Sequence, residues 1–109
     1  MPLQILGLNH NTAPVEIREQ VVFAGEEIPR ALQSLSTLEG VDEAILLSTC
    51  NRTEFYVMSR DEGRDQLKEW LHRDRQLADG FAESLFMLDE EEAIRHIFRV
   101  ACGLDSMVL

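Results

Sequence analysis

The sequence predicts an α+β domain in which helices pack on one face of a mostly antiparallel four-stranded sheet. Short β-prone segments and helical segments follow one another along the 109 residues in the order β-α-β-β-α-β-α. The second and third strands are separated by only a few residues, which predicts an antiparallel pair. No linker, repeat or low-complexity segment divides the chain. We therefore expect one domain, a sandwich of ferredoxin-like topology.

The first part of the chain supplies one strand and two helices. Residues 3–9, LQILGLN, are an apolar run that predicts a short buried strand. Pro14 follows a polar loop and predicts the first residue of a short helix, because first-turn N–H groups need no intrahelical partner. Residues 26–38 place apolar side chains at helical spacing, and Gly40 is a natural helix end.

The middle of the chain predicts a β-hairpin followed by a helix. Residues 41–49, VDEAILLST, and residues 52–59, RTEFYVMS, are apolar or rich in β-formers and predict the paired strands. Residues 61–78 carry apolar side chains at helical spacing. Alternation along the third strand defines two faces: Thr53, Phe55 and Val57 on one, Tyr56 and Met58 on the other.

The last part of the chain predicts a strand and a final helix. Residues 84–88, SLFML, form the strand, and residues 89–104 form the helix. Asp89 is its expected N-cap, and Glu92 completes a capping box. The apolar stripe expected to face the core is Ala93, Ile94, Ile97, Phe98, Ala101 and Leu104.

Composition limits the classes of function. The net charge is −10, and Lys68 is the sole lysine. Taken alone, this charge argues against a nucleic-acid partner or an anionic membrane, both of which bind basic surfaces. No signal peptide and no run of ~20 apolar residues, as a membrane span needs, is visible. Two cysteines are too few for a disulfide framework or a zinc site, so we expect reduced thiols, no metal and a cytoplasmic location.

The candidate chemistry lies in the stretch STCNRTEFY, residues 48–56. Cys50 directly follows an apolar strand and is flanked by Thr49, Asn51 and Arg52. A guanidinium two residues away favours the thiolate, which is the nucleophilic form of cysteine. A small buried cysteine at a strand end is the alternative, and the residues alone leave both interpretations open.

Other side chains also have two interpretations each. Arg52 is either a solvated strand-end residue or a fork for a substrate carboxylate. His96 lies at the margin of the apolar stripe, where an imidazole can reach a neighbouring site or stay half-buried at the surface. Ser106 is a capping hydroxyl or a substrate contact, Glu54 is expected to be exposed, and Cys102 to pack. No glycine-rich phosphate-binding pattern occurs, so we expect no nicotinamide site within the chain.

Three segments together resemble the N-terminal catalytic domain of the glutamyl-tRNA reductase family: LNHNTAPVEIRE, LLSTCNRTEFY and IRHIFRVACGLDSMVL. They occur in the family's order and spacing and cover essentially the whole chain. The resemblance implies an NADPH-dependent oxidoreductase that converts glutamyl-tRNA to glutamate-1-semialdehyde. That reaction is the entry to tetrapyrrole and heme biosynthesis. The resemblance also implies the ferredoxin-like fold.

The resemblance implies roles for particular residues. Cys50 would attack the glutamyl ester and form a thioester, from which hydride releases the aldehyde. His96 would be a proton shuttle or an orienting donor. Arg52 would bind the substrate's carboxylate. The other implied substrate-binding residues are Thr49, Asn51 and Ser106.

Members of the resembled family are longer than this chain. Residues 1–109 would be the acyl-transfer domain, ending before a connecting helix, an NADPH domain and a dimerisation domain. NADPH would then bind outside this chain, the fragment alone should not complete the reduction, and the full-length protein would be a homodimer. Glutamyl-tRNA is the implied substrate, and the next pathway enzyme, an aminomutase, is a candidate partner. Single arginines near the acceptor end of the tRNA would reconcile this substrate with the acidic charge.

Two other classes of function remain alternatives. A non-catalytic ferredoxin-like interaction or regulatory module would leave Cys50 unreactive. A thiol redox sensor would need Cys102 as its resolving cysteine, and the helical placement of Cys102 disfavours that. The pH dependence of Cys50 alkylation separates these classes, because a thiolate that reacts near neutral pH favours chemistry.

Overall fold

The structure, a computed structural model, describes residues 3–49, 51–60, 63–77 and 80–101. Cys50, Cys102 and Ser106 lie outside these ranges. The elements in chain order are β1 (Leu3–Asn9), α1 (Val15–Val21), η1 (Gly25–Glu27), α2 (Ile28–Leu35), β2 (Val41–Ser48), β3 (Arg52–Ser59), α3 (Gly63–Arg75), η2 (Phe81–Ser84), β4 (Phe86–Asp89) and α4 (Glu90–Ala101).

The strands of the described residues form one four-stranded antiparallel sheet in the order β2-β3-β1-β4. Strand β1 pairs with β3 from Leu3 opposite Met58 to Asn9 opposite Arg52. Strand β2 forms the predicted hairpin with β3, and β4 pairs with the other side of β1. The α+β class and the ferredoxin-like order of strands are therefore confirmed.

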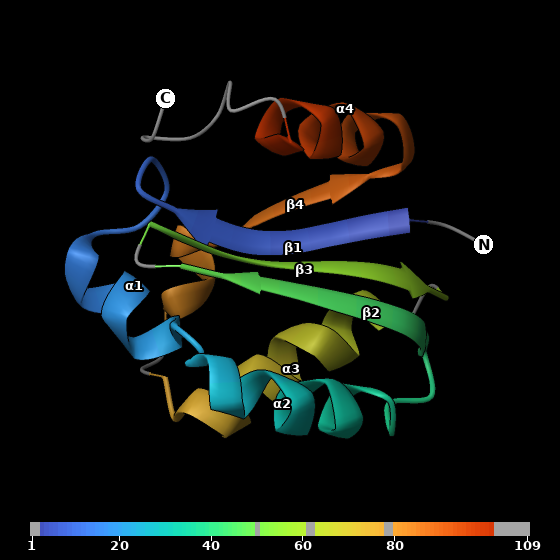
Figure 1. Ribbon diagram of the computed structural model, residues 1–109, viewed down its shortest axis with the longest axis horizontal. Helices are drawn as coiled ribbons and strands as arrows, with labels where there is room; N and C mark the ends of the chain where they lie inside the picture. The colour runs from blue at the N-terminus through green and yellow to red at the C-terminus, as the bar shows by residue number, and fades with distance from the viewer. Residues whose placement is uncertain (1–2, 50, 61–62, 78–79, 102–109) are drawn as a thin grey trace.

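Helices cover both faces of this sheet (Figure 1). Helices α2 and α3 lie on one face, and α4 lies on the other. The expectation that all helices share one face is therefore wrong for the last helix. The physical reason lies in β1, where the neighbouring residues Ile5 and Leu6 point to opposite faces and are both fully buried. A strand that is apolar on both sides needs a second covering layer.

The main core lies between the sheet and α1, α2 and α3, and aromatic rings occupy its centre. Phe55 of β3 meets the rings of Phe23 and Trp70 edge to face, with ring centroids 6.0 and 5.9 Å away. Arg75 lies over the Phe23 ring, 3.7 Å from its centroid, and Trp70 Nε1 donates to Ser34 Oγ at 2.8 Å. These contacts join α2, α3 and the sheet into one unit.

Several predicted boundaries differ from the structure by a few residues. Pro14 is the N-cap of α1 and not its first helical residue. The helix predicted over 26–38 divides into η1 and the shorter α2, with Pro29 in the first turn of α2, where a missing N–H costs little. Ser84, predicted to begin a strand, ends η2. Asp89 is the last residue of β4 and directly precedes α4, the place of the predicted N-cap.

The buried face of α4 differs from the prediction. Ile94, Ile97 and Phe98 are exposed, whereas Ala93 and His96 are buried. The helix is therefore rotated so that an imidazole, and not the centre of the apolar stripe, points to the sheet. The partner of that imidazole explains the orientation and is described next.

Candidate active site

The β2–β3 hairpin carries Thr49, Asn51 and Arg52 at one end of the sheet. The Thr49 N–H donates to the Arg52 carbonyl oxygen at 2.7 Å. Thr49 Oγ1 in turn accepts the backbone N–H groups of Asn51 and Arg52, each at 3.2 Å. The hydroxyl of Thr49 thus fixes the shape of the turn. Cys50 stands between Thr49 and Asn51 in the chain, outside the described residues.

Neighbouring segments hold this hairpin in place. Ser48 Oγ accepts the backbone N–H of Phe23 at 2.8 Å and lies 3.0 Å from Thr53 Oγ1. From α1, Arg18 Nη1 donates to Asn51 Oδ1 at 3.5 Å. Arg18 therefore adds a second guanidinium beside the hairpin, one that the sequence analysis did not select. Its signal is its place inside the first of the three resembling segments.

The loop after β1 lies next to the hairpin, because Asn9 pairs with Arg52 across the sheet. Asn9 is buried, and its Oδ1 accepts the backbone N–H groups of Asn11 at 2.8 Å and Thr12 at 3.2 Å. Thr12 Oγ1 accepts the Asn9 N–H at 3.0 Å. This closed turn places a rigid polar loop at the same end of the sheet as the hairpin.

Glu54 is the centre of a buried polar group, which we call the Glu54 cluster: Arg52, Glu54, Tyr56 and His96. Glu54 is 0% exposed. Arg52 Nη1 lies 2.6 Å from its Oε2, and His96 Nε2 lies 2.9 and 3.0 Å from Oε2 and Oε1. The Tyr56 hydroxyl donates to Oε1. Two elements distant in sequence, β3 and α4, therefore meet at one carboxylate.

The expectation that Glu54 is exposed is wrong. Alternation along β3 places Arg52, Glu54 and Tyr56 on the face that α4 covers, and the sequence analysis placed no helix on that face. A buried carboxylate is costly unless charged or polar donors compensate it. Removing one partner from a buried ion pair typically destabilises a fold by about 3–5 kcal/mol. The stability of this fold therefore depends on the cluster remaining intact.

The surroundings of Tyr56 change the pKa of its hydroxyl. Burial, followed by its hydrogen bond to Glu54 and the negative charge of that carboxylate, raises the pKa of Tyr56 well above its ordinary value. Tyr56 therefore remains a neutral donor to Glu54 at physiological pH.

The structure brings together the four predicted site residues that it describes, Thr49, Asn51, Arg52 and His96. Arg52 and His96 both contact the Glu54 carboxylate, and Arg52 is the first residue of β3. Thr49 and Asn51 lie in the β2–β3 hairpin. Glu54 itself was missed, although two charged residues and a tyrosine at alternate positions of one strand are a visible signal of a polar face.

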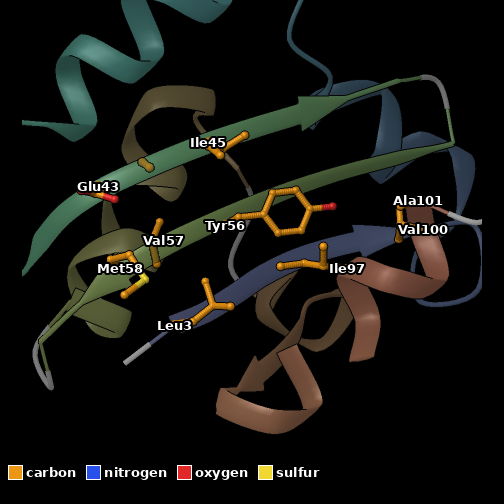
Figure 2. Close-up of a pocket in the computed structure, with 10 residues that line it drawn as sticks. Leu3, Glu43, Ile45, Tyr56, Val57, Met58, Ile97, Val100 and Ala101 are labelled. Carbon is orange, nitrogen blue, oxygen red and sulfur yellow. The ribbon is translucent and has the colours of Figure 1, made fainter. Parts of the chain in front are cut away.

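A separate apolar groove of about 570 Å³ lies between α4 and the sheet (Figure 2). The ring of Tyr56 lines this groove while its hydroxyl reaches Glu54, so the groove and the Glu54 cluster share one wall. The other lining residues are Leu3, Glu43, Ala44, Ile45, Val57, Met58, Ile97, Val100 and Ala101. This apolar lining suits packing better than acid–base chemistry.

Metal and membrane features can be assessed for the described residues alone. Within them, no group of three or more His, Cys, Asp or Glu side chains could hold a metal ion. No helix in the same part of the chain is long and apolar enough to cross a membrane.

Comparison with known proteins identifies one family. The family described as "Glutamyl-tRNAGlu reductase, N-terminal domain" matches residues 6–109. Proteins named glutamyl-tRNA reductase from Xanthomonas oryzae pv. oryzae and Stenotrophomonas maltophilia are 57% and 52% identical over 109 residues, which is 100% of this chain and 24% of each relative. The solved glutamyl-tRNA reductase from Methanopyrus kandleri has a TM-score of 0.66 and 32% identity, over 96% of this chain and 23% of that one. The chain thus spans about a quarter of the length of its relatives.

Proposed function

The chain belongs to the family of glutamyl-tRNA reductase N-terminal domains, and on that premise we propose that it is the acyl-transfer domain of an enzyme that converts glutamyl-tRNA to glutamate-1-semialdehyde. The observation that carries the proposal is the Glu54 cluster, which joins Arg52 and His96 beside the hairpin that includes position 50. This reaction would be the first step of tetrapyrrole and heme biosynthesis by that route.

Cys50 is the proposed nucleophile. Its thiolate attacks the carbonyl carbon of the glutamyl ester, the carbon–sulfur bond forms, and the bond from that carbon to the ribose oxygen of the tRNA breaks. The proton of the thiol ends on the ribose hydroxyl, and His96 is our candidate to carry it. The thioester carbonyl is less resonance-stabilised than the ester carbonyl, so the thioester is the better hydride acceptor.

Basic and polar groups around the hairpin would bind the glutamyl substrate. A guanidinium has five N–H donors, so the contact of Arg52 with Glu54 is compatible with a second contact to the substrate's carboxylate. Thr49 and Asn51 would contact the same substrate from the turn, and Ser106 from the segment after α4. Arg18, which holds Asn51, adds positive charge near an acyl-tRNA end.

NADPH would supply the hydride in the full-length protein. We assign its binding to a part outside this chain, since these 109 residues contain no dinucleotide-binding glycine pattern and span 24% of the relatives' length. We assign homodimer formation to the same missing part. An aminomutase that accepts the reactive aldehyde is the proposed partner, and the low cysteine count fits a cytoplasmic location.

The test uses the full-length protein with NADPH withheld, so that the thioester accumulates. The protein is mixed with tRNA that carries a radiolabelled glutamyl group, quenched in acid and separated under denaturing conditions. The parent and the control Cys102→Ala should carry label, and Cys50→Ser should carry none. Labelling of Cys50→Ser to the level of the parent would end the proposal.

A further inference from the structure

We propose that Glu54 is a positioning residue that fixes His96 in its Nε2–H tautomer and so makes Nδ1 the nitrogen that exchanges a proton during acyl transfer. The tautomer follows from the Glu54 cluster alone. The use of Nδ1 in acyl transfer rests on the proposed function.

The donors around Glu54 require it to act as a carboxylate. Arg52 Nη1 lies 2.6 Å from Oε2, and a guanidinium keeps its protons at any physiological pH. The Tyr56 hydroxyl donates to Oε1, and the raised pKa of Tyr56 is consistent with a proton held there. A protonated Glu54 would place an additional O–H among these donors. The ionised form, which accepts at both oxygens, satisfies them all.

The position of His96 then determines its tautomer. Its Nε2 lies 2.9 Å from Oε2 and 3.0 Å from Oε1 of Glu54. Since a carboxylate only accepts hydrogen bonds, Nε2 must carry the hydrogen. In a neutral imidazole the other nitrogen, Nδ1, is then the base. The same division of labour orients the histidine of a serine-protease triad, where the wrong tautomer removes most of the activity.

Neighbouring residues hold the side chains of Glu54 and His96 in this geometry. His96 is 8% exposed, and its ring centroid lies 5.3 Å from that of Phe86 on β4. On β1, a Cβ added at Gly7 would lie 2.9 Å from Glu54 Cγ, so Gly7 leaves space for the carboxylate side chain and for no more. Strands β1, β3 and β4 and helix α4 therefore jointly set the geometry of the Glu54–His96 pair.

Charged side chains surround His96. Arg52 and Glu54 come from β3, next to the neutral Tyr56. A small cavity of about 250 Å³ beside His96 is also lined by Leu88 of β4 and by Glu92, Arg95 and Arg99 of α4.

Glu54→Gln tests the idea because it preserves shape and exchanges one acceptor oxygen for an amide NH2. Arg52 has only donors, so the remaining oxygen of the amide should turn to Arg52. The NH2 group then faces His96 and Tyr56. Where Nε2 accepts from that NH2 group, the imidazole proton moves to Nδ1, while the remaining oxygen, which corresponds to the one 2.9 Å from Nε2, competes as an acceptor of Nε2–H. We therefore expect the Nδ1–H fraction of His96 to rise in Glu54→Gln.

The first measurement is the tautomer itself, from long-range nitrogen–proton NMR correlations of the 109-residue chain labelled in histidine. The parent should show Nε2–H at His96, Glu54→Gln should show a larger fraction of Nδ1–H, and Glu54→Asp should retain Nε2–H because it retains a carboxylate. The matched control Glu91→Gln, on the exposed side of α4, should leave His96 unchanged. Nδ1–H in the parent, or a tautomer ratio in Glu54→Gln equal to that of the parent, would overturn the inference.

The second measurement is the single-turnover rate of thioester formation in the full-length protein with saturating glutamyl-tRNA and no NADPH. Glu54→Gln should be slower by roughly 100-fold, the scale of general acid–base catalysis, with a shifted pH profile, and Glu54→Asp should fall between it and the parent. A parent-like rate and pH profile in Glu54→Gln, while Cys50→Ser forms no thioester, would reject this inference and leave the proposed function standing. Thioester on Cys50→Ser would reject the proposed function instead.

Discussion

Glu54 determines the state of each residue that touches it. Its carboxylate accepts hydrogen bonds from a guanidinium, an imidazole and a phenol in a place without solvent, where such bonds are stronger and unpaired groups more costly than in water. The local sequence makes Cys50 and Arg52 candidates for chemistry, because their neighbours in the chain are polar or charged. It could not predict the role of Glu54, because the decisive partner, His96, is 42 positions away.

Tyr56 gives a pH-dependent test of the cluster. Burial and the hydrogen bond to Glu54 raise the pKa of Tyr56, so the folded chain keeps a proton that the unfolded chain loses above pH ~10. The stability contributed by this proton is fully present below pH ~10 and is lost as the pH rises further. The free energy of unfolding of Tyr56→Phe should therefore fall less steeply above pH ~10 than that of the parent.

The measurement is direct because Tyr56 is the sole tyrosine. Ultraviolet absorbance of tyrosinate reports its titration in the folded and the urea-unfolded chain. If tyrosinate appears at the same pH in both, the hydrogen bond between Tyr56 and Glu54 does not exist as described.

At the scale of elements, the strands were predicted more accurately than the helices. The ends of β1 and β3 coincide with the predicted segments 3–9 and 52–59. Strand limits follow from local β-propensity and turn residues, which the sequence displays directly. The orientation of α4 was predicted wrongly, because hydrophobic periodicity takes the apolar stripe as the buried face. In this chain the attraction of His96 to Glu54 orients the helix, and that interaction is tertiary.

A substitution at Gly7 tests how closely β1 approaches the neighbouring strands β3 and β4. At Gly7 an added Cβ would lie 2.9 Å from Glu54 Cγ, Phe86 Cζ and the Thr53 carbonyl oxygen. Gly7→Ala should lower the free energy of unfolding by roughly 1–3 kcal/mol through overpacking and should slow thioester formation by displacing Glu54.

Gly25→Ala is the matched control for that substitution, since nothing lies within 4 Å of its added Cβ. Urea unfolding followed by the fluorescence of Trp70 measures both variants. Equal stability of Gly7→Ala and Gly25→Ala would show that β1 has more room around the carboxylate than the structure indicates.

At the scale of the whole molecule, the charge of −10 acts over the entire chain. The molecule measures 37 × 31 × 27 Å, and the screening length is ~30 Å in 0.01 M salt but ~10 Å in 0.1 M salt. At low salt, carboxylates on all sides therefore repel one another, whereas exposed ion pairs such as Arg60–Asp42 contribute about 0–1 kcal/mol each. Because of the same charge, the proposed binding of glutamyl-tRNA would depend on local positive charge, such as that of Arg18.

This balance predicts that added salt stabilises the 109-residue chain. The free energy of unfolding should rise as sodium chloride increases from about 0.01 to 0.1 M, because repulsion is screened more than the buried Glu54 cluster. Urea unfolding of the parent across this range is the measurement. A decrease in stability with salt would mean that surface ion pairs outweigh the net repulsion.

The central claim is that Cys50 accepts the glutamyl group beside the Glu54 cluster. Its most direct test is to locate that group by mass spectrometry after the full-length protein has reacted with glutamyl-tRNA without NADPH, been quenched in acid and been digested. We predict the glutamyl group as a thioester on the peptide that contains Cys50. A glutamyl group on Cys102, or on no cysteine at all, would contradict the account.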